Sequence, residues 1–395
     1  MLNKAGQREL AYVIKIDNIM PITGADNICL ACANGWQVIV KKTEFNIGDK
    51  AVFFEIDSKV PADEERYAFL SKRGYKIKTM KLNRFGVFSQ GLLMPMSEFP
   101  ELGDVEVGTP LTEKLHVRYA VEEDNARKSN TVNNKTKYQA MSARHKDLFK
   151  KKPFRWLMRR EWGRKLLFIF FGKKKDNPRS FPTKFPYVKR SDEERVENMP
   201  YILQNKEPWV RTQKIDGTSS TYILERIKKN KFEEYVCSRN VRQLTPSQEN
   251  FHKDIEGNVY WQMADKYHIF DFLKKYLIEN NLDYVALQGE TAGPNIQGNP
   301  HKFKEIRFFG YNFIRSDIGR MGSVEASRIC EEAGIPWVPI ADEAYILPDD
   351  MEIMKLSADG PCIVGEGPRE GWVYRSQDGK QSFKNVSREY LLKHG

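Results

Sequence analysis

A lysine followed two residues later by Asp-Gly is the pattern in this chain best suited to covalent chemistry. Trp209 to Gln213 is β-prone, Asp216-Gly217 predicts a turn, and a second strand is predicted over 219–224. Lys214 is therefore expected at a strand–turn junction, where its amine can be fixed over a pocket. A lysine amine becomes a nucleophile once burial or a cationic neighbour lowers its pKa. Taken alone, these four residues more often form an ordinary hairpin.

Further charged and aromatic residues recur in or near predicted strands downstream of Lys214. They are Ser238-Arg239-Asn240, Gly289-Glu290, Tyr311, Glu370-Gly371 and Phe383-Lys384. Each has an ordinary structural explanation, because an acid at a strand end is usually solvated and an aromatic strand is usually core. Helices are predicted over 258–280 and 325–333, and Ser387 is expected to cap a closing helix.

Taken together, these segments resemble in order and type the motifs of covalent nucleotidyltransferases, which include nucleic-acid ligases and mRNA capping enzymes. The resemblance covers residues 9–120 and 186–395. Arg375, at the end of Glu370–Arg375, is typical of RNA ligases, where DNA ligases usually carry lysine. A β-rich module precedes the catalytic region, as in the ATP-dependent RNA ligases that have an N-terminal OB domain, sometimes called the fifth class.

The resemblance implies a mechanism and a set of roles. Lys214 would attack the α-phosphorus of ATP, releasing pyrophosphate and forming lysyl-AMP. AMP would then pass to an RNA 5′-phosphate, and attack by a 3′-hydroxyl would release AMP, with joining expected at nicks in duplexes. Asp216 and Glu370 are expected to bind Mg²⁺ or Mn²⁺, whose charge would keep Lys214 deprotonated. Tyr311 should stack on adenine. The nucleotide contacts that the resemblance implies come from Gln213, Asp216, Gly217, Arg239, Glu290, Tyr311, Glu370 and Lys384.

Two positions depart from the family pattern, and three other functions compete. The fifth motif is often Lys-x-Lys but reads Ser382-Phe383-Lys384 here, and the acid that often follows the stacking aromatic is Asn312. A capping-type guanylyltransferase would use GTP in place of ATP. A DNA ligase is disfavoured by Arg375 and by the domain order. A non-catalytic RNA-binding protein would have had little reason to keep the charged motif residues.

The fold class predicted is α+β, in three parts. Residues 1–120 form an OB-type β-barrel that binds nucleic acid, and 186–395 form an ATP-grasp-like nucleotidyltransferase domain with antiparallel sheets and flanking helices. Residues 75–82 alternate as a strand with lysines on one face, which either contacts a phosphate backbone or is simply solvated. A helix with Ser191 as N-cap and Glu194 three residues later is predicted over 191–198.

The intervening segment 121–185 is basic and partly helical. Between Arg127 and Arg190, roughly twenty Lys and Arg residues face only three acidic residues. Residues 145–171 are expected to be helical, with aromatic side chains interleaved among the basic ones. Such a segment can bind nucleic acid or a membrane surface, or pack its aromatic residues on its own domain, and the sequence leaves these alternatives open.

Composition sets the expected partner and compartment. The chain of 395 residues carries a formal net charge of +11, which favours RNA or an RNA-containing duplex as the partner. Met1–Leu10 lacks the apolar core of a secretory signal, and no apolar run is long enough to span a membrane. Five scattered cysteines indicate a reduced, intracellular chain, with Cys29-x-x-Cys32 structural. We expect a cytoplasmic monomer.

Overall fold

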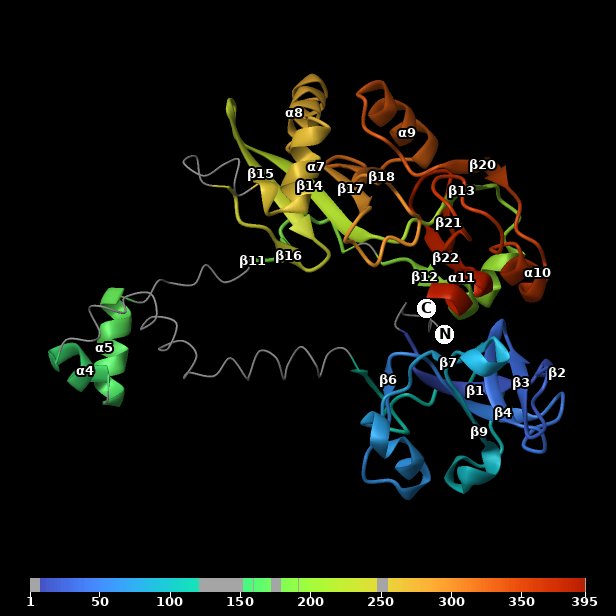
Figure 1. Ribbon diagram of the computed structural model, residues 1–395. Coiled ribbons are helices and arrows are strands. Elements are labelled where there is room, and N and C mark those ends of the chain that lie inside the picture. Colours follow the sequence, from blue (N-terminus) through green and yellow to red (C-terminus); the bar gives the residue numbers. More distant parts are fainter. Residues whose placement is uncertain are drawn as a thin grey trace. The chain divides into compact units, whose positions relative to one another are not determined.

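The computed structural model describes residues 8–120, 152–158, 160–171, 179–190, 192–246 and 255–394 (Figure 1). By contacts between residues, the chain divides into two units. One comprises residues 1–56, 77–115 and 178–395, and the other comprises 57–76 and 116–177. Residues 57–76, which the sequence would assign to the N-terminal module, thus group with the segment that follows it. No helix in the described ranges is long and apolar enough to cross a bilayer.

The N-terminal strands form two small sheets around one core. Aromatic side chains fill that core, with the Tyr12, Trp36 and Phe53 rings almost fully buried and the centroids of Trp36 and Phe53 5.5 Å apart. This is the small all-β module that the sequence predicts. One sheet has the order β1 (Ala11–Lys15), β5 (Lys50–Phe54), β9 (Leu92–Pro95), and the other has β2 (Asn18–Pro21), β3 (Ile28–Ala33), β4 (Trp36–Lys41).

The strand predicted over 75–82 is wrong for its first half. Only β7 (Met80–Leu82) pairs as a strand, with β8 (Val87–Ser89). Tyr75 has a φ of 61°, following Gly74 with a φ of 62°, so the backbone turns at the point where an extended strand was expected. The lysines at 76, 78 and 81 therefore do not share one continuous strand face.

In its described residues, the second unit contains short elements and two α-helices. The 3₁₀ helix η1 (Glu65–Arg73) accompanies the paired strands β6 (Ser58–Lys59) and β10 (Arg118–Tyr119). Helices α4 (Lys152–Met158) and α5 (Glu161–Phe171) pack together, with the Trp156 and Trp162 rings 6.0 Å apart. The predicted helix over 145–171 is thus two helices in its described part, and residues 145–151 lie outside the described residues.

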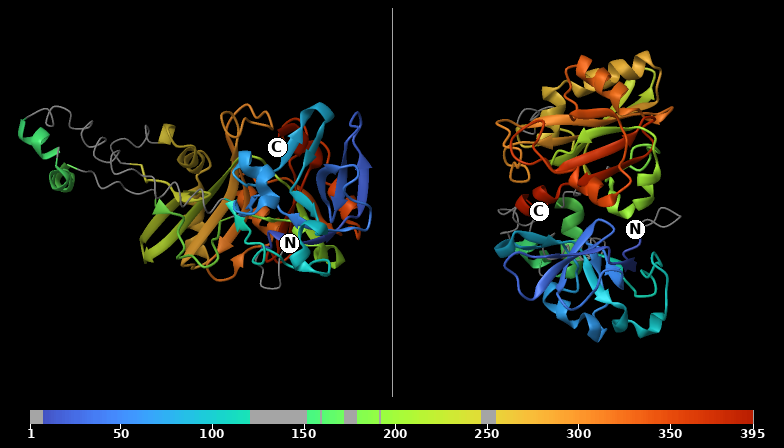
Figure 2. Two further views of the ribbon diagram at one scale, coloured as in Figure 1. Left: turned by 90° about the horizontal axis from the view of Figure 1, so that it is seen from below. Right: turned by 90° about the vertical axis from the view of Figure 1, so that its right-hand side faces the viewer.

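A seven-stranded antiparallel sheet dominates the C-terminal region. Its order is β11 (Arg179–Ser180), β16 (Val241–Arg242), β15 (Lys231–Ser238), β14 (Thr218–Lys228), β17 (Tyr284–Ala292), β18 (Arg307–Arg315), β19 (Gly319–Arg320). Helices α7 (Val259–Lys266), α8 (Ile269–Glu279) and α9 (Ser323–Glu332) pack on one face (Figure 2). On the other face, Phe181, Phe185 and Val188 cover part of β14, β15 and β17.

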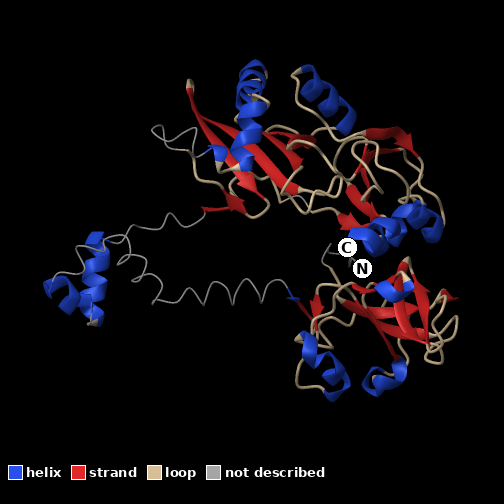
Figure 3. Cartoon of the chain, viewed as in Figure 1, coloured by secondary structure: helices blue, strands red, loops and turns tan. Residues whose placement is uncertain are grey.

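A five-stranded sheet completes this region (Figure 3). Its order is β12 (Glu194–Arg195), β22 (Ser382–Val386), β21 (Gly371–Ser376), β13 (Trp209–Gln213), β20 (Ile340–Tyr345), with only the β12–β22 pair parallel. Trp209, Tyr374 and Phe383 form its core, where the Tyr374 and Phe383 rings stack 4.8 Å apart. The described C-terminal residues also form α10 (Met351–Leu356), α11 (Arg388–His394) and the 3₁₀ helices η5 (Val196–Asn198) and η6 (Pro200–Gln204). The N-terminal module contains the 3₁₀ helices η2 (Asn83–Phe85), η3 (Met96–Glu98) and η4 (Pro100–Leu102).

Two helix predictions in this region are corrected. The predicted helix over 258–280 is two helices, because His268 adopts a left-handed conformation (φ 47°) between α7 and α8. Residues 192–198 form no α-helix. Glu194 and Arg195 pair with β22 as β12. The Glu194 carboxylate accepts hydrogen bonds from the Arg195 backbone N–H and from the Asn198 side chain. The predicted cap Ser191 lies outside the described residues.

We predict that the buried stripe of α8 stabilises the C-terminal region. Leu273 is fully buried against the seven-stranded sheet, whereas the neighbouring Lys275 is exposed. Leu273→Ala should lower the free energy of unfolding by about 2–5 kcal/mol, because it removes buried surface and leaves a cavity. Lys275→Ala, the matched control, should change it by less than about 0.5 kcal/mol. Equal urea midpoints for the two variants would show that this face is not core.

Candidate active site

The Lys214–Gly217 turn is where the chain crosses from one sheet to the other. β13 ends at Gln213 in the five-stranded sheet, and β14 begins at Thr218 in the seven-stranded sheet. The Lys214 backbone N–H donates to the Gly371 carbonyl at 3.0 Å, so the first residue of the turn is still bonded to β21. The Lys214 side chain therefore emerges where the two sheets meet, not in a simple hairpin.

Two glycines allow the backbones to approach closely at this crossing. A Cβ atom on Gly217 would lie 2.3 Å from the Thr291 carbonyl oxygen on β17. Gly371, which opens β21, has a φ of 144°, and a Cβ atom there would lie 2.2 Å from the Asn385 carbonyl oxygen on β22. Any larger residue would force these strands apart. The glycines that follow Asp216 and Glu370 are therefore required by packing.

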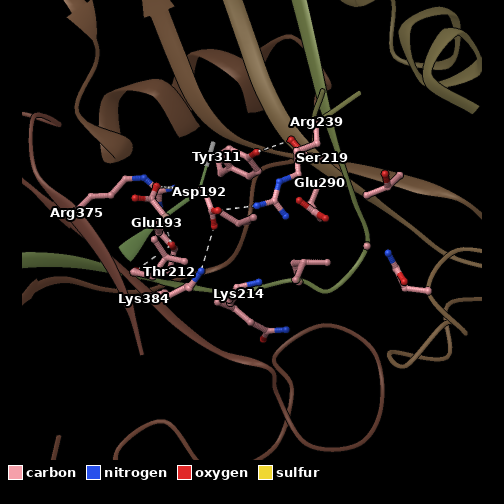
Figure 4. A pocket seen from close by; sticks show the side chains of 17 residues that line it. Asp192, Glu193, Thr212, Lys214, Ser219, Arg239, Glu290, Tyr311, Arg375 and Lys384 are labelled. Atoms are coloured by element: carbon pink, nitrogen blue, oxygen red, sulfur yellow. Dashed lines mark hydrogen bonds and ion pairs between the residues drawn. The ribbon is translucent and has the colours of Figure 1, made fainter. Parts of the chain in front are cut away.

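A cavity of about 270 Å³ opens at the crossing (Figure 4). Lys214 lies on its wall, and strands from both sheets supply the lining side chains. Of the residues predicted from sequence, those on the wall are Gln213, Lys214, Gly217, Arg239, Glu290, Tyr311 and Lys384. The other lining residues are Asp192, Glu193, Thr212, Ile215, Thr218, Ser219, Gln297, Val338, Val373 and Arg375.

Two cations of the cavity wall converge on one carboxylate. Asp192 accepts from Arg239 Nη2 at 2.6 Å and from Lys384 Nζ at 3.2 Å, as the dashed lines in Figure 4 show. Burial would raise the pKa of Asp192, but the charges of Lys384 and Arg239 outweigh it and lower that pKa. Arg239 and Lys384 come from different sheets, so this carboxylate marks a point at which both can bind an anion such as a phosphate oxygen.

An aromatic ring and a buried arginine form another part of the wall. The Tyr311 hydroxyl lies 3.2 Å from Ser219 Oγ, and the Arg375 guanidinium lies 5.7 Å from the centroid of the Tyr311 ring. Arg375 donates to Asn312 Oδ1 at 3.2 Å and to Thr212 Oγ1 at 3.1 Å. Its ion pair with Glu193 spans 3.5 Å. Arg375 thus joins β18 of one sheet to β13 and β21 of the other.

Three carboxylates surround the Lys214 amine. Glu370 Oε1 accepts from Lys214 Nζ at 2.6 Å, and the charges of Glu290 and Asp216 act on the same amine. The Asp216 carboxylate accepts from the Tyr390 hydroxyl at 2.6 Å. Asp216 and Glu370, both predicted from sequence, therefore lie beside Lys214 rather than on the cavity wall.

Comparison with models of known protein families gives two matches. Residues 10–96 match an OB-fold domain, and residues 207–392 match the RNA ligase family. The match assigns residues 207–392 to the RNA ligase family. These matches confirm the resemblance drawn from the motifs and the predicted fold class, an N-terminal OB domain followed by a mixed α+β nucleotidyltransferase domain.

Solved structures of an RNA ligase from Naegleria gruberi resemble nearly the whole chain. A variant bound to AMP and manganese is 28% identical with a TM-score of 0.65, and another bound to ATP and manganese is 27% identical with a TM-score of 0.65. The same enzyme bound to pyrophosphate is 28% identical with a TM-score of 0.64. Each comparison covers 98% of this chain and 99% of the other. The search of curated proteins gave no match.

The charges in the RNA ligase site favour a protonated Lys214. Burial of the amine lowers its pKa, but the charges of Glu370, Glu290 and Asp216 outweigh burial and raise it. Burial, opposed by Lys214 and assisted by Glu370, raises the pKa of Glu290 to about 8. The described residues alone therefore do not generate a free amine, and the two acids Asp216 and Glu370 beside the single Lys214 amine favour binding of a further cation.

The carboxylates of the RNA ligase fit a divalent metal ion whose other ligands come from elsewhere. Glu370 Oε2 is buried and accepts no hydrogen bond from any described residue, so it has a lone pair directed at no protein donor. Among described residues, no group of three or more His, Cys, Asp or Glu side chains forms a complete metal site. Mg²⁺ commonly binds through one or two carboxylates, substrate phosphates and water, which suits this arrangement.

Sequence reasoning missed two acids of the cavity wall, Asp192 and Glu193. They precede Glu194 in a pattern typical of a helix N-terminus, which gave no reason to place them against a site more than twenty residues away. Thr212 and Ser219 flank the Lys-x-Asp-Gly motif and could have been inferred from strand alternation alone. His301 and Tyr390, which contact Asp216, had no recognisable signal.

We predict that Asp192 competes with anionic ligands for Arg239 and Lys384. Asp192→Asn removes the negative charge but keeps a similar shape, so AMP should bind about threefold to tenfold more tightly in the absence of divalent metal. Calorimetric titration with EDTA present measures this. Asp317→Asn, which alters an acid paired with Arg315 outside the cavity lining, is the control and should leave affinity unchanged. Weaker AMP binding by Asp192→Asn would contradict the prediction.

Proposed function

We propose that this RNA ligase uses ATP to join RNA 3′-hydroxyl and 5′-phosphate ends through lysyl-AMP and AMP-RNA intermediates. The observation that carries the proposal is the position of Lys214 Nζ on the wall of a cavity whose other walls supply Arg239, Lys384 and Tyr311. An amine, two anion-binding cations and an aromatic ring are the groups that nucleotidyl transfer from ATP requires. The motif series and the nucleotide-bound Naegleria structures support the same reading.

Each cavity residue has a role in this proposal. Arg239 and Lys384 neutralise phosphate charge, since phosphoryl transfer depends mostly on positioning and on charge neutralisation. Tyr311 stacks on adenine, and Gln213, Gly217 and Glu290 contact the rest of the nucleotide. The fold orients these groups before the nucleotide binds, because they lie on, or directly beside, strands of the two sheets.

Asp216 and Glu370 are the residues that would bind Mg²⁺ or Mn²⁺. A divalent metal supplies Lewis-acid stabilisation of phosphate charge. Glu370 Oε1 is already bonded to the Lys214 ammonium, so its recruitment to a metal would release that amine and favour its neutral, nucleophilic form. Glu370 would thus control the protonation of Lys214 Nζ.

We further propose that the substrate is a nick in an RNA-containing duplex and that the enzyme acts as a cytoplasmic monomer. The net charge of +11 suits a polyanionic partner. The cysteines are free and four of the five are buried, which suits a reducing compartment.

The covalent step predicts transfer of AMP to a single lysine. Incubation with α-labelled ATP and a divalent metal should label the wild-type protein, and Lys214→Ala should abolish labelling while the melting temperature stays close to wild type. Lys275→Ala, an exposed lysine on α8, should label normally. Labelling of the Lys214→Ala variant would refute the assignment. A parallel reaction with α-labelled GTP separates this enzyme from a capping-type guanylyltransferase.

The RNA preference can be measured on nicked duplexes that differ only at the 3′-terminal sugar. A ribose at the nick should be sealed at least about tenfold faster than a deoxyribose, a difference that corresponds to about 1.4 kcal/mol in the transition state. The duplexes should otherwise be identical. Equal sealing rates would favour a DNA ligase. Efficient joining of single-stranded ends with no sealing of nicks would contradict the nick assignment alone.

A further inference from the structure

His301 lies behind the catalytic turn and bonds to its backbone. The residue belongs to the segment between β17 and β18, and its exposed fraction is 0%. Its Nε2 atom accepts a hydrogen bond from the Asp216 backbone N–H at 2.8 Å. A backbone N–H that is buried without a partner is costly, so this contact fixes the orientation of the peptide two residues after Lys214.

The hydrogen bonds of His301 define which ring nitrogen carries the proton. A peptide N–H can only donate, so Nε2 must be unprotonated and Nδ1 must carry the hydrogen. Nδ1 lies 3.3 Å from Cys362 Sγ, and Cys362 Sγ in turn donates to the Pro368 carbonyl at 3.4 Å. The Asp216 N–H, the His301 Nδ1–H and the Cys362 S–H thus form a relay of three hydrogen bonds in which each donor meets an acceptor. The relay runs from the catalytic turn to Pro368, which precedes β21.

Tyr390 on α11 holds the same turn from its other side. Its hydroxyl donates to Asp216 Oδ2 at 2.6 Å, and its ring stacks on that of His301 with an interplanar angle of 23° and centroids 6.5 Å apart. Asp216 is thus held at its backbone by one ring and at its carboxylate by the other. The two rings also contact each other.

The backbone of His301 is itself fixed by the segment that carries Cys362. The Glu366 N–H donates to the His301 carbonyl at 3.0 Å, and a Cβ atom on Gly365 would lie 2.5 Å from that oxygen. His301 therefore has little freedom to move away from Asp216.

We propose that His301, in the tautomer that the Asp216 N–H requires and whose Nδ1–H meets Cys362 Sγ, is a positioning residue that fixes the Lys214–Gly217 turn for nucleotidyl transfer. The inference rests on the proposed function, since it assigns His301 a part in the Lys214 reaction. His301 touches the backbone of the turn and acts on Lys214 through it. Loss of the Nε2 acceptor allows the Asp216 peptide to rotate, and the direction of Lys214 Nζ rotates with it.

Two replacements of His301 separate hydrogen bonding from packing. His301→Gln keeps an acceptor close to the Nε2 position, whereas His301→Leu fills similar space without one. In single-turnover self-adenylylation with α-labelled ATP, His301→Leu should be slower than wild type by about tenfold to a hundredfold, with ATP affinity changed less than about threefold. His301→Gln should restore most of the rate. Equal rates for the two folded variants, or a faster His301→Leu, would overturn the proposal.

The tautomer is tested at Cys362, outside the catalytic motifs. Cys362→Ser keeps a group that can donate and accept, whereas Cys362→Val fills the site with an apolar side chain and leaves the His301 Nδ1–H without its acceptor. Cys362→Val should slow self-adenylylation by at least about threefold relative to Cys362→Ser. Equal rates at matched melting temperatures would remove Cys362 from the proposal. Absence of labelling in the wild-type protein would instead defeat the proposed function itself.

Discussion

The passage of one continuous chain between two sheets at residues 214–217 is the constraint on which the rest of the catalytic region depends. Because β13 and β14 belong to different sheets, the connecting turn must lie where those sheets meet. Gly217 and Gly371 make this approach possible by leaving room for neighbouring carbonyl groups. The cavity therefore follows from topology, and Lys214 is on its wall because it is the first residue beyond β13.

The two sheets are also joined by a network of buried polar side chains centred on Arg375. The guanidinium reaches Thr212 on β13 and Asn312 on β18, and Asn312 donates to Gln288 on β17 at 3.1 Å. An arginine buried in this way must be satisfied by acceptors and a countercharge, here Glu193. The neutral Asn312 is thereby explained: the acid that the family pattern places next to the aromatic is supplied by a different segment.

The sequence identified residues of the cavity wall better than it identified the residues that support them. Lys214, Arg239, Glu290, Tyr311 and Lys384 lie in short motifs on or directly beside strands, and all five line the cavity. His301 could not be found this way, because its role depends on a contact across 85 residues of sequence.

The errors in helix prediction have local causes that tertiary structure overrode. The periodicity of 258–280 is helical throughout, yet the left-handed His268 divides it, and nothing in the amino-acid pattern signals that backbone conformation. The pattern Ser191-x-x-Glu194 predicts a helix, because serine and glutamate side chains at this spacing can accept hydrogen bonds from the free N–H groups of a helix N-terminus. Glu194 is instead the first residue of the two-residue strand β12, and its carboxylate accepts hydrogen bonds from the Arg195 N–H and the Asn198 side chain.

The ion pair between Lys214 and Glu370 also bears on the chemical durability of the protein. An ammonium group has no lone pair, so it does not react with isocyanate, aldehydes or activated acyl groups that modify free amines. The carboxylate of Glu370 therefore lowers the reactivity of the Lys214 amine toward such electrophiles as well as toward the nucleotide.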